Sequence, residues 1–164
     1  MAETDSDVTV DVEDAQPEEE IRICLFSIGE DMYAIPVTLL TEIIIPQKIF
    51  PVPTTPSYVR GVINLRGNIV PIVEIREMLS LAQPASTAGQ IAIIKYSTIT
   101  IGIVVDNVYE ITSVPVSSVL TIPADFGAQP GRNRSRFFKG IVQREAGLAA
   151  LLNIERILEE ILLT

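Results

Sequence analysis

Few side chains in this sequence could carry out chemistry, and those few are poorly placed for it. The chain has no histidine, so it cannot form a Ser-His-Asp triad, a Cys-His pair, an imidazole metal site or a phosphorylated histidine. The single cysteine, Cys24, lies in the apolar run 21–28, which predicts a buried core residue. Asp106 and Glu110 are the nearest candidates for a carboxylate acid-base pair, but a turn residue and a surface residue explain them better. A carboxylate hydrolase is therefore a weak alternative.

Motifs for phosphate, nucleotide and metal binding are also missing. The sequence has no Walker-type phosphate loop and no dinucleotide glycine fingerprint, and one cysteine cannot build a structural zinc site. A phospho-receiver domain needs alternating strands and helices, whereas the apolar segments here follow one another with short connections. The sequence therefore predicts no enzyme, no cofactor and no metal, and it leaves a binding surface as the functional feature.

The negative charge of the chain is concentrated at its start. The net charge is −9, and residues 1–20 hold nine acidic residues and no basic one, which leaves 12 acidic against 12 basic residues afterwards. We predict that residues 1–20 form a disordered, solubilising acidic tail, with a regulatory contact as the alternative. The balanced remainder argues against nucleic-acid binding, because affinity for a phosphate backbone needs a basic surplus.

A local basic cluster is the exception to this balance, and its members are Arg132, Arg134, Arg136, Lys139 and Arg144. The cluster could bind an acidic partner, although a solvated loop and strand edge explain it more simply. A small barrel that binds nucleic acid through aromatic platforms is the alternative function for the whole chain. The electrically balanced body and only nine aromatic residues oppose that alternative.

The elements that must carry a binding surface are short strands. Residues 21–28 and 32–35 predict a hairpin around the turn 29–31, and residues 37–44 predict a short helix or turn before a strand. Four prolines between residues 46 and 56 predict an ordered, extended loop. Residues 75–81 predict a short helix and residues 82–89 a flexible connection. The second half adds strands at 91–96, 99–105, 108–114, 136–142 and 148–152, so the fold class is all-β.

The segment 62–73 predicts a hairpin with Gly67 and Asn68 as its two-residue turn. We place Arg66 opposite Ile69, which puts Arg66 and Asn64 on the face away from the core. The sequence therefore predicts an accessible polar pair near a hairpin tip.

The chain closes on a predicted amphipathic helix, in which the apolar residues Ile154, Ile157, Leu158, Ile161 and Leu162 repeat at helical spacing. Asn153 is a suitable N-cap. We expect this helix to seal an opening in the sheet.

Two features that the sequence lacks, a membrane-spanning stretch and a secretory signal, indicate where in the cell the protein lies. No apolar stretch reaches the roughly 18 residues that a membrane-spanning helix needs, and the start of the chain lacks the basic and apolar pattern of a secretory signal. We therefore expect a soluble, cytoplasmic protein without direct membrane insertion.

Residues 58–73, with the sequence YVRGVINLRGNIVPIV, closely resemble the chemotaxis coupling proteins of the CheW family. The likeness extends upstream to residues 33–36 and 42–44, and downstream to residues 101–106 and 140–158, so it covers nearly everything after residue 21. The resemblance implies two intertwined five-stranded SH3-like β-barrels packed around a common hydrophobic region, with the C-terminal helix completing the structure.

The resemblance also implies a function without catalysis. Members of this family are adaptors that bind the cytoplasmic tip of a methyl-accepting chemoreceptor and the regulatory domain of a CheA-type histidine kinase, in chemotaxis or pilus motility. Arg66 and Asn64 would belong to the receptor-coupling surface, and Leu40, Glu42 and Gly61 would match positions where changes disrupt coupling. Gly61 is equally explained as a glycine that the backbone needs before a strand, and Leu40 as a core residue.

Overall fold

The structure is a computed structural model of the 164-residue chain, and it describes residues 18–79, 81, 89–122, 128–129 and 132–162. Residues 1–17 lie outside this description, so the predicted disorder of the tail stays a prediction, as does the flexible connection at residues 82–88. In the part of the chain that the structure describes, no helix is long and apolar enough to cross a membrane.

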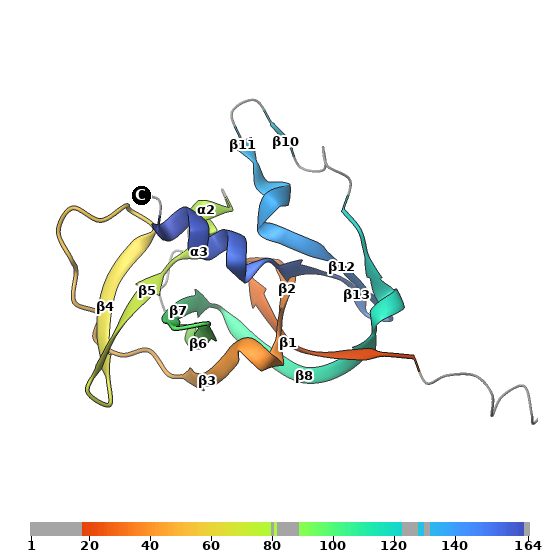
Figure 1. Cartoon of the computed structure of the whole chain (residues 1–164), viewed down its shortest axis with the longest axis horizontal. Helices are drawn as coiled ribbons and strands as arrows, with labels where there is room; N and C mark the ends of the chain where they lie inside the picture. Colours follow the sequence, from red (N-terminus) through yellow and green to blue (C-terminus); the bar gives the residue numbers. More distant parts are fainter. Residues whose placement is uncertain (1–17, 80, 82–88, 123–127, 130–131, 163–164) are drawn as a thin grey trace, which may run out of the picture.

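Two β-sheets make up most of the molecule (Figure 1). Sheet A has the strand order β8-β1-β2-β13-β12-β9, and sheet B has the order β3-β6-β7-β5-β4. The strands of sheet A are β1 (Glu20–Ile28), β2 (Asp31–Pro36), β8 (Asn107–Pro115), β9 (Val119–Leu120), β12 (Phe138–Arg144) and β13 (Gly147–Leu152). Those of sheet B are β3 (Leu40–Ile44), β4 (Val59–Leu65), β5 (Asn68–Val73), β6 (Gln90–Tyr96) and β7 (Ile99–Val105).

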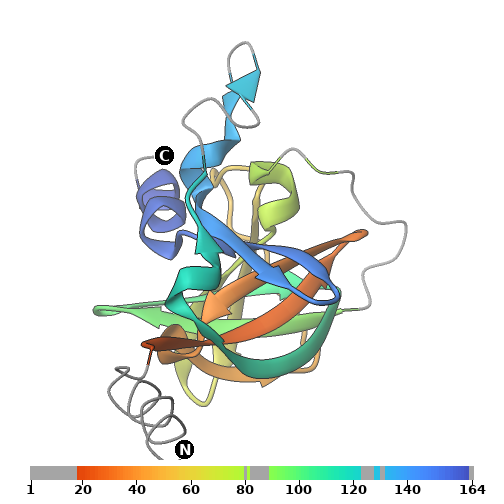
Figure 2. The same cartoon turned by 90° about the vertical axis from the view of Figure 1, so that its right-hand side faces the viewer.

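Short helical pieces join and cover these sheets. They are η1 (Val37–Leu39), α2 (Ile75–Met78), η2 (Val116–Ser118), η3 (Arg134–Phe137) and α3 (Ile154–Leu162), and a small ribbon of β10 (Ala128–Gln129) and β11 (Arg132–Asn133) stands apart. Figure 1 shows α3 above the junction of the two sheets, and the turned view in Figure 2 shows α2 and α3 on the same side of them. The predicted strands and both predicted helices are thus confirmed, except that residues 136 and 137 belong to η3 instead of the strand predicted at 136–142.

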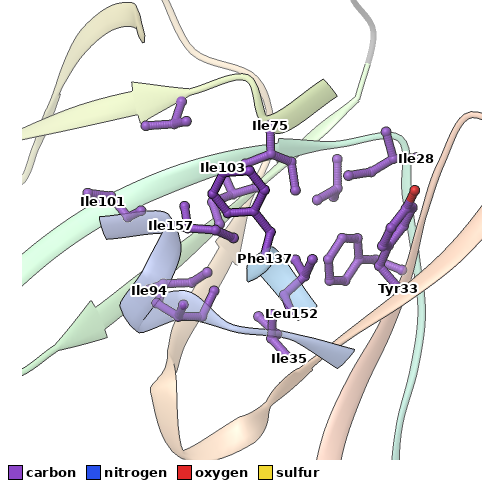
Figure 3. Packing of buried hydrophobic residues seen from close by; sticks show 14 of the residues in the cluster. Ile28, Tyr33, Ile35, Ile75, Ile94, Ile101, Ile103, Phe137, Leu152 and Ile157 are labelled. Carbon is purple, nitrogen blue, oxygen red and sulfur yellow. The ribbon is translucent and has the colours of Figure 1, made fainter. Parts of the chain in front are cut away.

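A shared apolar core lies between the two sheets. Its largest cluster takes Phe26 and Ile35 from sheet A, Ile94 and Ile103 from sheet B, and Ile157 from α3 (Figure 3). All five side chains are almost completely buried. Each sheet also encloses a smaller apolar cluster of its own. Because side chains alternate along a strand, a strand between two cores must be apolar on both faces. Strand β1 shows this, since Leu25 points into the core of sheet A while its neighbours Cys24 and Phe26 point into the shared core.

The helix α3 covers this core as the sequence predicted. Ile154, Ile157 and Leu158 are buried in it. The Asn153 side-chain oxygen accepts a hydrogen bond from the backbone N–H of Arg156 at 3.2 Å, so Asn153 is the N-cap. Packing of one apolar face therefore holds a helix too short to be stable alone.

A buried ionic cluster ties the two sheets together where the chain passes from β7 to β8. Asp106 is the one residue between these strands, and its carboxylate accepts hydrogen bonds from Arg76 of α2 and from the backbone N–H of Gly29, the latter at 2.7 Å. Arg76 also contacts Glu74, whose second oxygen pairs with Arg60 at 3.3 Å. Burial raises the pKa of Glu74, although both arginines act to lower it. Asp106 is therefore a structural link between α2 and the β1–β2 turn.

Asp106→Asn should lower the free energy of unfolding by about 3 kcal/mol, because Arg76 is buried and would lose its strongest charged partner. Urea unfolding followed by circular dichroism measures the change. Glu110→Gln is the matched control, since Glu110 is exposed on β8 and its replacement should alter stability by no more than about 0.5 kcal/mol. Equal effects of the two substitutions would contradict the structural role of Asp106.

Candidate functional site

The hairpin of β4 and β5 presents Arg66 in its turn. Leu65 pairs with Asn68, so Arg66 and Gly67 are the two turn residues, and the prediction that Gly67 and Asn68 form the turn was wrong. Both turn residues have positive φ, 52° and 89°, the sign that a type I′ turn requires. The Asn64 side-chain oxygen accepts a hydrogen bond from the Gly67 N–H at 2.8 Å, which stabilises the turn one residue earlier than predicted.

This correction leaves the buried face of the hairpin unchanged. Ile63 faces Val70 instead of Ile72, and Asn64, not Arg66, faces Ile69. Each pairing moves by two positions, and a shift of two keeps every side chain on its own face of the sheet. Arg66 and Asn64 are both exposed, as predicted, but Arg66 extends from the turn and does not lie on the strand beside Asn64.

Arg66 forms a two-armed ion pair with Glu42 of β3. One guanidinium nitrogen lies 3.2 Å from one carboxylate oxygen, and the other nitrogen contacts the second oxygen. Hydrogen bonding from Arg66 lowers the pKa of Glu42 below 4.5 and raises the pKa of Arg66. The Arg66 side chain remains 67% exposed. Glu42 thus fixes the direction of an arginine whose remaining N–H groups face solvent.

A groove of about 450 Å³ lies beside this ion pair. All five strands of sheet B, β3 to β7, and the turns β4–β5 and β6–β7 contribute its lining, which is Thr41, Glu42, Leu65, Arg66, Asn68, Ile69, Val70, Ile93, Lys95, Thr98 and Thr100. The floor is apolar, because Leu65, Val70 and Ile93 are buried, whereas Ile69 on the rim is 66% exposed. An apolar floor with a charged, hydroxyl-rich rim can bind a protein segment that has apolar and polar groups.

Sequence reasoning missed part of this groove. Lys95, Thr98 and Thr100 come from the β6–β7 hairpin, which was read only as a pair of strands. The signal was available, since Lys95 interrupts an otherwise apolar strand and Thr98 and Thr100 alternate with isoleucines. Nothing in the sequence says that this hairpin and the β4–β5 turn meet.

Gly61 has a structural role. It lies at a bulge in β4 with φ of +142°, and a Cβ added there would be 2.3 Å from the backbone oxygen of Phe50. Phe50 forms an isolated β-bridge with Val62, the residue after Gly61, so the close approach belongs to this backbone contact with β4. The backbone therefore requires a glycine at this position, which supports the structural interpretation of Gly61. A substitution of Gly61 would affect coupling through the fold.

Leu40 is partly buried and is the apolar residue of the predicted site. It begins β3 next to Ile94 and packs, partly buried, against the shared core. Glu42 lies two residues further along the same strand, where it holds Arg66. The structure therefore brings Arg66, Asn64 and Glu42 to one end of sheet B and places Leu40 and Gly61 beneath or beside it.

The residues considered for catalysis are separated from this groove. Asp106 serves the ionic cluster, and Glu110 lies exposed on β8. Cys24 is 1% exposed, and burial raises the pKa of its thiol, which agrees with its prediction as a core residue. Among the described residues, no three His, Cys, Asp or Glu side chains gather as metal ligands would.

The sequence matches a known protein family. The family model described as the CheW-like domain matches residues 22–162, which is most of the chain. This chain belongs to the CheW family. It is 31% identical to the chemotaxis protein CheW of Bacillus subtilis over 140 residues, covering 85% of this chain and 87% of that protein. It is 30% identical to the CheW of Thermotoga maritima over 144 residues, covering 87% and 90%.

A solved structure shows the same fold. The crystal structure of the scaffolding protein TtCheW from Thermoanaerobacter tengcongensis superposes with a TM-score of 0.73, covers 82% of this chain and 90% of that one, and has 23% sequence identity. The predicted fold of two SH3-like β-barrels is thereby confirmed. As a CheW-family protein, this chain is a non-catalytic chemotaxis coupling scaffold.

Gly61→Ala should lower the free energy of unfolding by about 3 kcal/mol, because the new methyl group meets backbone in an unfavourable φ. Thermal and urea unfolding measure the change. Gly67→Ala is the control: its φ is also positive, but nothing lies within 4 Å of the added Cβ, so only about 1 kcal/mol should be lost. A Gly61→Ala protein as stable as the Gly67→Ala protein would remove the backbone explanation.

The ion pair can be tested in solution by titrating Glu42. Carbon-detected NMR of its carboxyl group should give a midpoint below 4.5, because Arg66 stabilises the carboxylate. The paired form should therefore persist as the pH falls through 4.5 and be lost only at a lower pH. In Arg66→Gln the midpoint should return toward 4.5, and a midpoint that does not move would show that the pair does not form.

Proposed function

We propose that this chain links the cytoplasmic tip of a methyl-accepting chemoreceptor to the regulatory domain of a CheA-type histidine kinase, and that it is recruited to receptor arrays by these contacts. The observation that carries the proposal is the match of residues 22–162 to the CheW-like domain. The output of such a complex is chemotaxis or pilus-based motility.

We assign the exposed end of sheet B to partner binding, with Arg66 as the main contact and Asn64 and Glu42 as the residues that position it. Three features support the assignment. Arg66 is mostly exposed yet held in one orientation by Glu42. The groove beside it has an apolar floor, and Ile69 on its rim is an exposed large apolar residue. Arginines held at the edge of an apolar surface are frequent hot spots of protein interfaces.

Leu40 and Gly61 support the same surface from within. Leu40 anchors β3 to the shared core, and Gly61 lets the chain around Phe50 approach β4. Substitutions there would disturb coupling by moving Glu42 or the β4–β5 hairpin. The nucleic-acid alternative has little in its favour at this groove, since one of the two basic residues that line it, Arg66, is paired with a carboxylate.

Calorimetric titration of the full chain against the regulatory domain of each CheA-type kinase of the source organism tests the function. Saturable one-to-one binding to one kinase is expected, and failure to bind all of them would refute the proposal. A parallel titration against single-stranded oligonucleotides at low salt should show no tight binding.

Arg66→Ala should weaken receptor coupling about thirtyfold, the usual effect of removing a hot-spot arginine, while the circular dichroism spectrum and melting temperature stay nearly unchanged. The strength of coupling is measured as receptor-dependent activation of the kinase in a reconstituted complex. Arg156→Ala is the control, because Arg156 is a comparably exposed arginine that pairs with Glu159 on α3. Equal losses in both variants would show a general charge effect, and an unfolded Arg66→Ala protein would show a structural role.

A further inference from the structure

The charges that line the groove beside Arg66 do not cancel. The ionised side chains of its lining are Glu42, Arg66 and Lys95. Glu42 and Arg66 form the two-armed ion pair, so each neutralises the other. The Lys95 side chain is exposed, and none of the described residues forms an ion pair or a side-chain hydrogen bond with it. The groove therefore keeps one uncompensated positive charge.

The strand register places Lys95 above the apolar floor of the groove. Ile93 belongs to the buried cluster inside sheet B, and Lys95 follows it by two residues, so both lie on the same face of β6. Thr100 of β7 is paired with Lys95 and shares that face. The rim of the groove thus has a free ammonium group and a hydroxyl group on neighbouring strands, directly beyond buried apolar side chains.

Glu42 reaches the same rim from the other neighbour of β6. It is paired with Ile93, and a bulge in β3 lies between Leu40 and Glu42. The bulge lets Leu40 pack against the shared core while Glu42 lines the groove. The carboxylate of Glu42 is held by Arg66, and no ion pair joins it to Lys95 in the described part of the chain. The fold therefore pairs one cation of the rim and leaves the other free.

The two cations suit different groups of a bound partner. Arg66, whose charge Glu42 balances, can donate its free N–H groups to neutral acceptors such as backbone carbonyl oxygens. Lys95 has an unbalanced charge, so a carboxylate is the group that it attracts most strongly. Ile69, which is 66% exposed on the same rim, offers an apolar contact. A complementary segment has a carboxylate near an apolar side chain.

We propose that the chemoreceptor segment bound in this groove presents an acidic side chain to Lys95, beside an apolar side chain that covers Ile69. This inference rests on the proposed function and adds a second charged contact with a separate task. Arg66 fixes the position of the bound segment. Lys95 selects a segment with an acidic residue and attracts it as it approaches.

Binding of purified cytoplasmic receptor fragments from the source organism, measured over a range of salt concentrations, tests the proposal. At about 0.05 M salt, Lys95→Gln should weaken binding about fivefold, the upper end for an ion pair at an interface rim. The affinity of the unsubstituted chain should fall as salt is added, and that of Lys95→Gln should fall much less, because its charged contact is gone.

Arg22→Gln is the control for net charge. Arg22 is an exposed residue of β1 in sheet A, so this substitution removes the same charge from a different sheet. The Arg22→Gln protein should bind the receptor fragment and respond to salt as the unsubstituted chain does.

A double substitution separates the tasks of the two cations. Glu42→Gln combined with Arg66→Gln removes the ion pair without changing the net charge of the groove. This protein should bind more weakly but keep the original dependence on salt, whereas Lys95→Gln should lose that dependence. A Lys95→Gln protein with weaker binding and an unchanged dependence on salt would show that Lys95 acts through the fold, which would overturn the proposal.

Acidic-to-amide substitutions in the receptor fragment identify the carboxylate. One of them should weaken binding to the unsubstituted chain about fivefold and cause no further loss with Lys95→Gln. If Lys95→Gln binds normally, or if every amide substitution adds its full effect to that of Lys95→Gln, the proposal is overturned and the proposed function stands. Failure of the unsubstituted chain to bind any receptor fragment would refute the receptor link itself, and this inference with it.

Discussion

The apolar layer between the two sheets is the constraint on which the rest of the molecule depends. Neither sheet buries both of its faces alone, so Phe26 of one sheet and Ile103 of the other exclude water only when the sheets meet. The strands at this junction are consequently apolar on both faces. Inside sheet B the packing is equally tight, since a Cβ on Gly102 would be 2.6 Å from the side chain of Ile72 in the smaller cluster of that sheet.

The partner surface that we propose at Arg66 depends on this packing. Glu42 belongs to β3, at one edge of sheet B, and Arg66 follows β4, at the other edge. The two edges meet because the sheet curls. Phe50, in the segment that connects β3 to β4, bridges to Val62 of β4 and holds this segment against the sheet. A rigid frame therefore holds an exposed side chain in a fixed direction, which lowers the entropy lost on binding.

Much of the fold could be predicted from the sequence because local signals agreed with the final structure. The alternation of Ile99, Ile101 and Ile103 gave β7, and Asn153 gave the start of α3. The turn at Arg66 was misplaced because a Gly-Asn pair resembles a turn, whereas the hydrogen bond from the Gly67 N–H to the Asn64 side chain decided the register. The ion pair of Arg66 with Glu42 could not be predicted, since it joins residues 24 apart whose meeting depends on barrel closure.

The order in which the strands appear along the chain also constrains how the protein is made. The parallel pairing of Tyr33 with Ala150 means that β2 completes its ladder with a strand near the other end of the sequence. Sheet B, in contrast, uses only residues 40–105. During translation the ribosome therefore releases β1 and β2 before their outer partners, β8 for β1 and β13 for β2. Sheet B has all of its strands by residue 105 and can assemble while β2 still lacks β13. Sheet A would then be the last part to form, and a newly made chain that stops before residue 150 leaves its first hairpin exposed to chaperones and to aggregation.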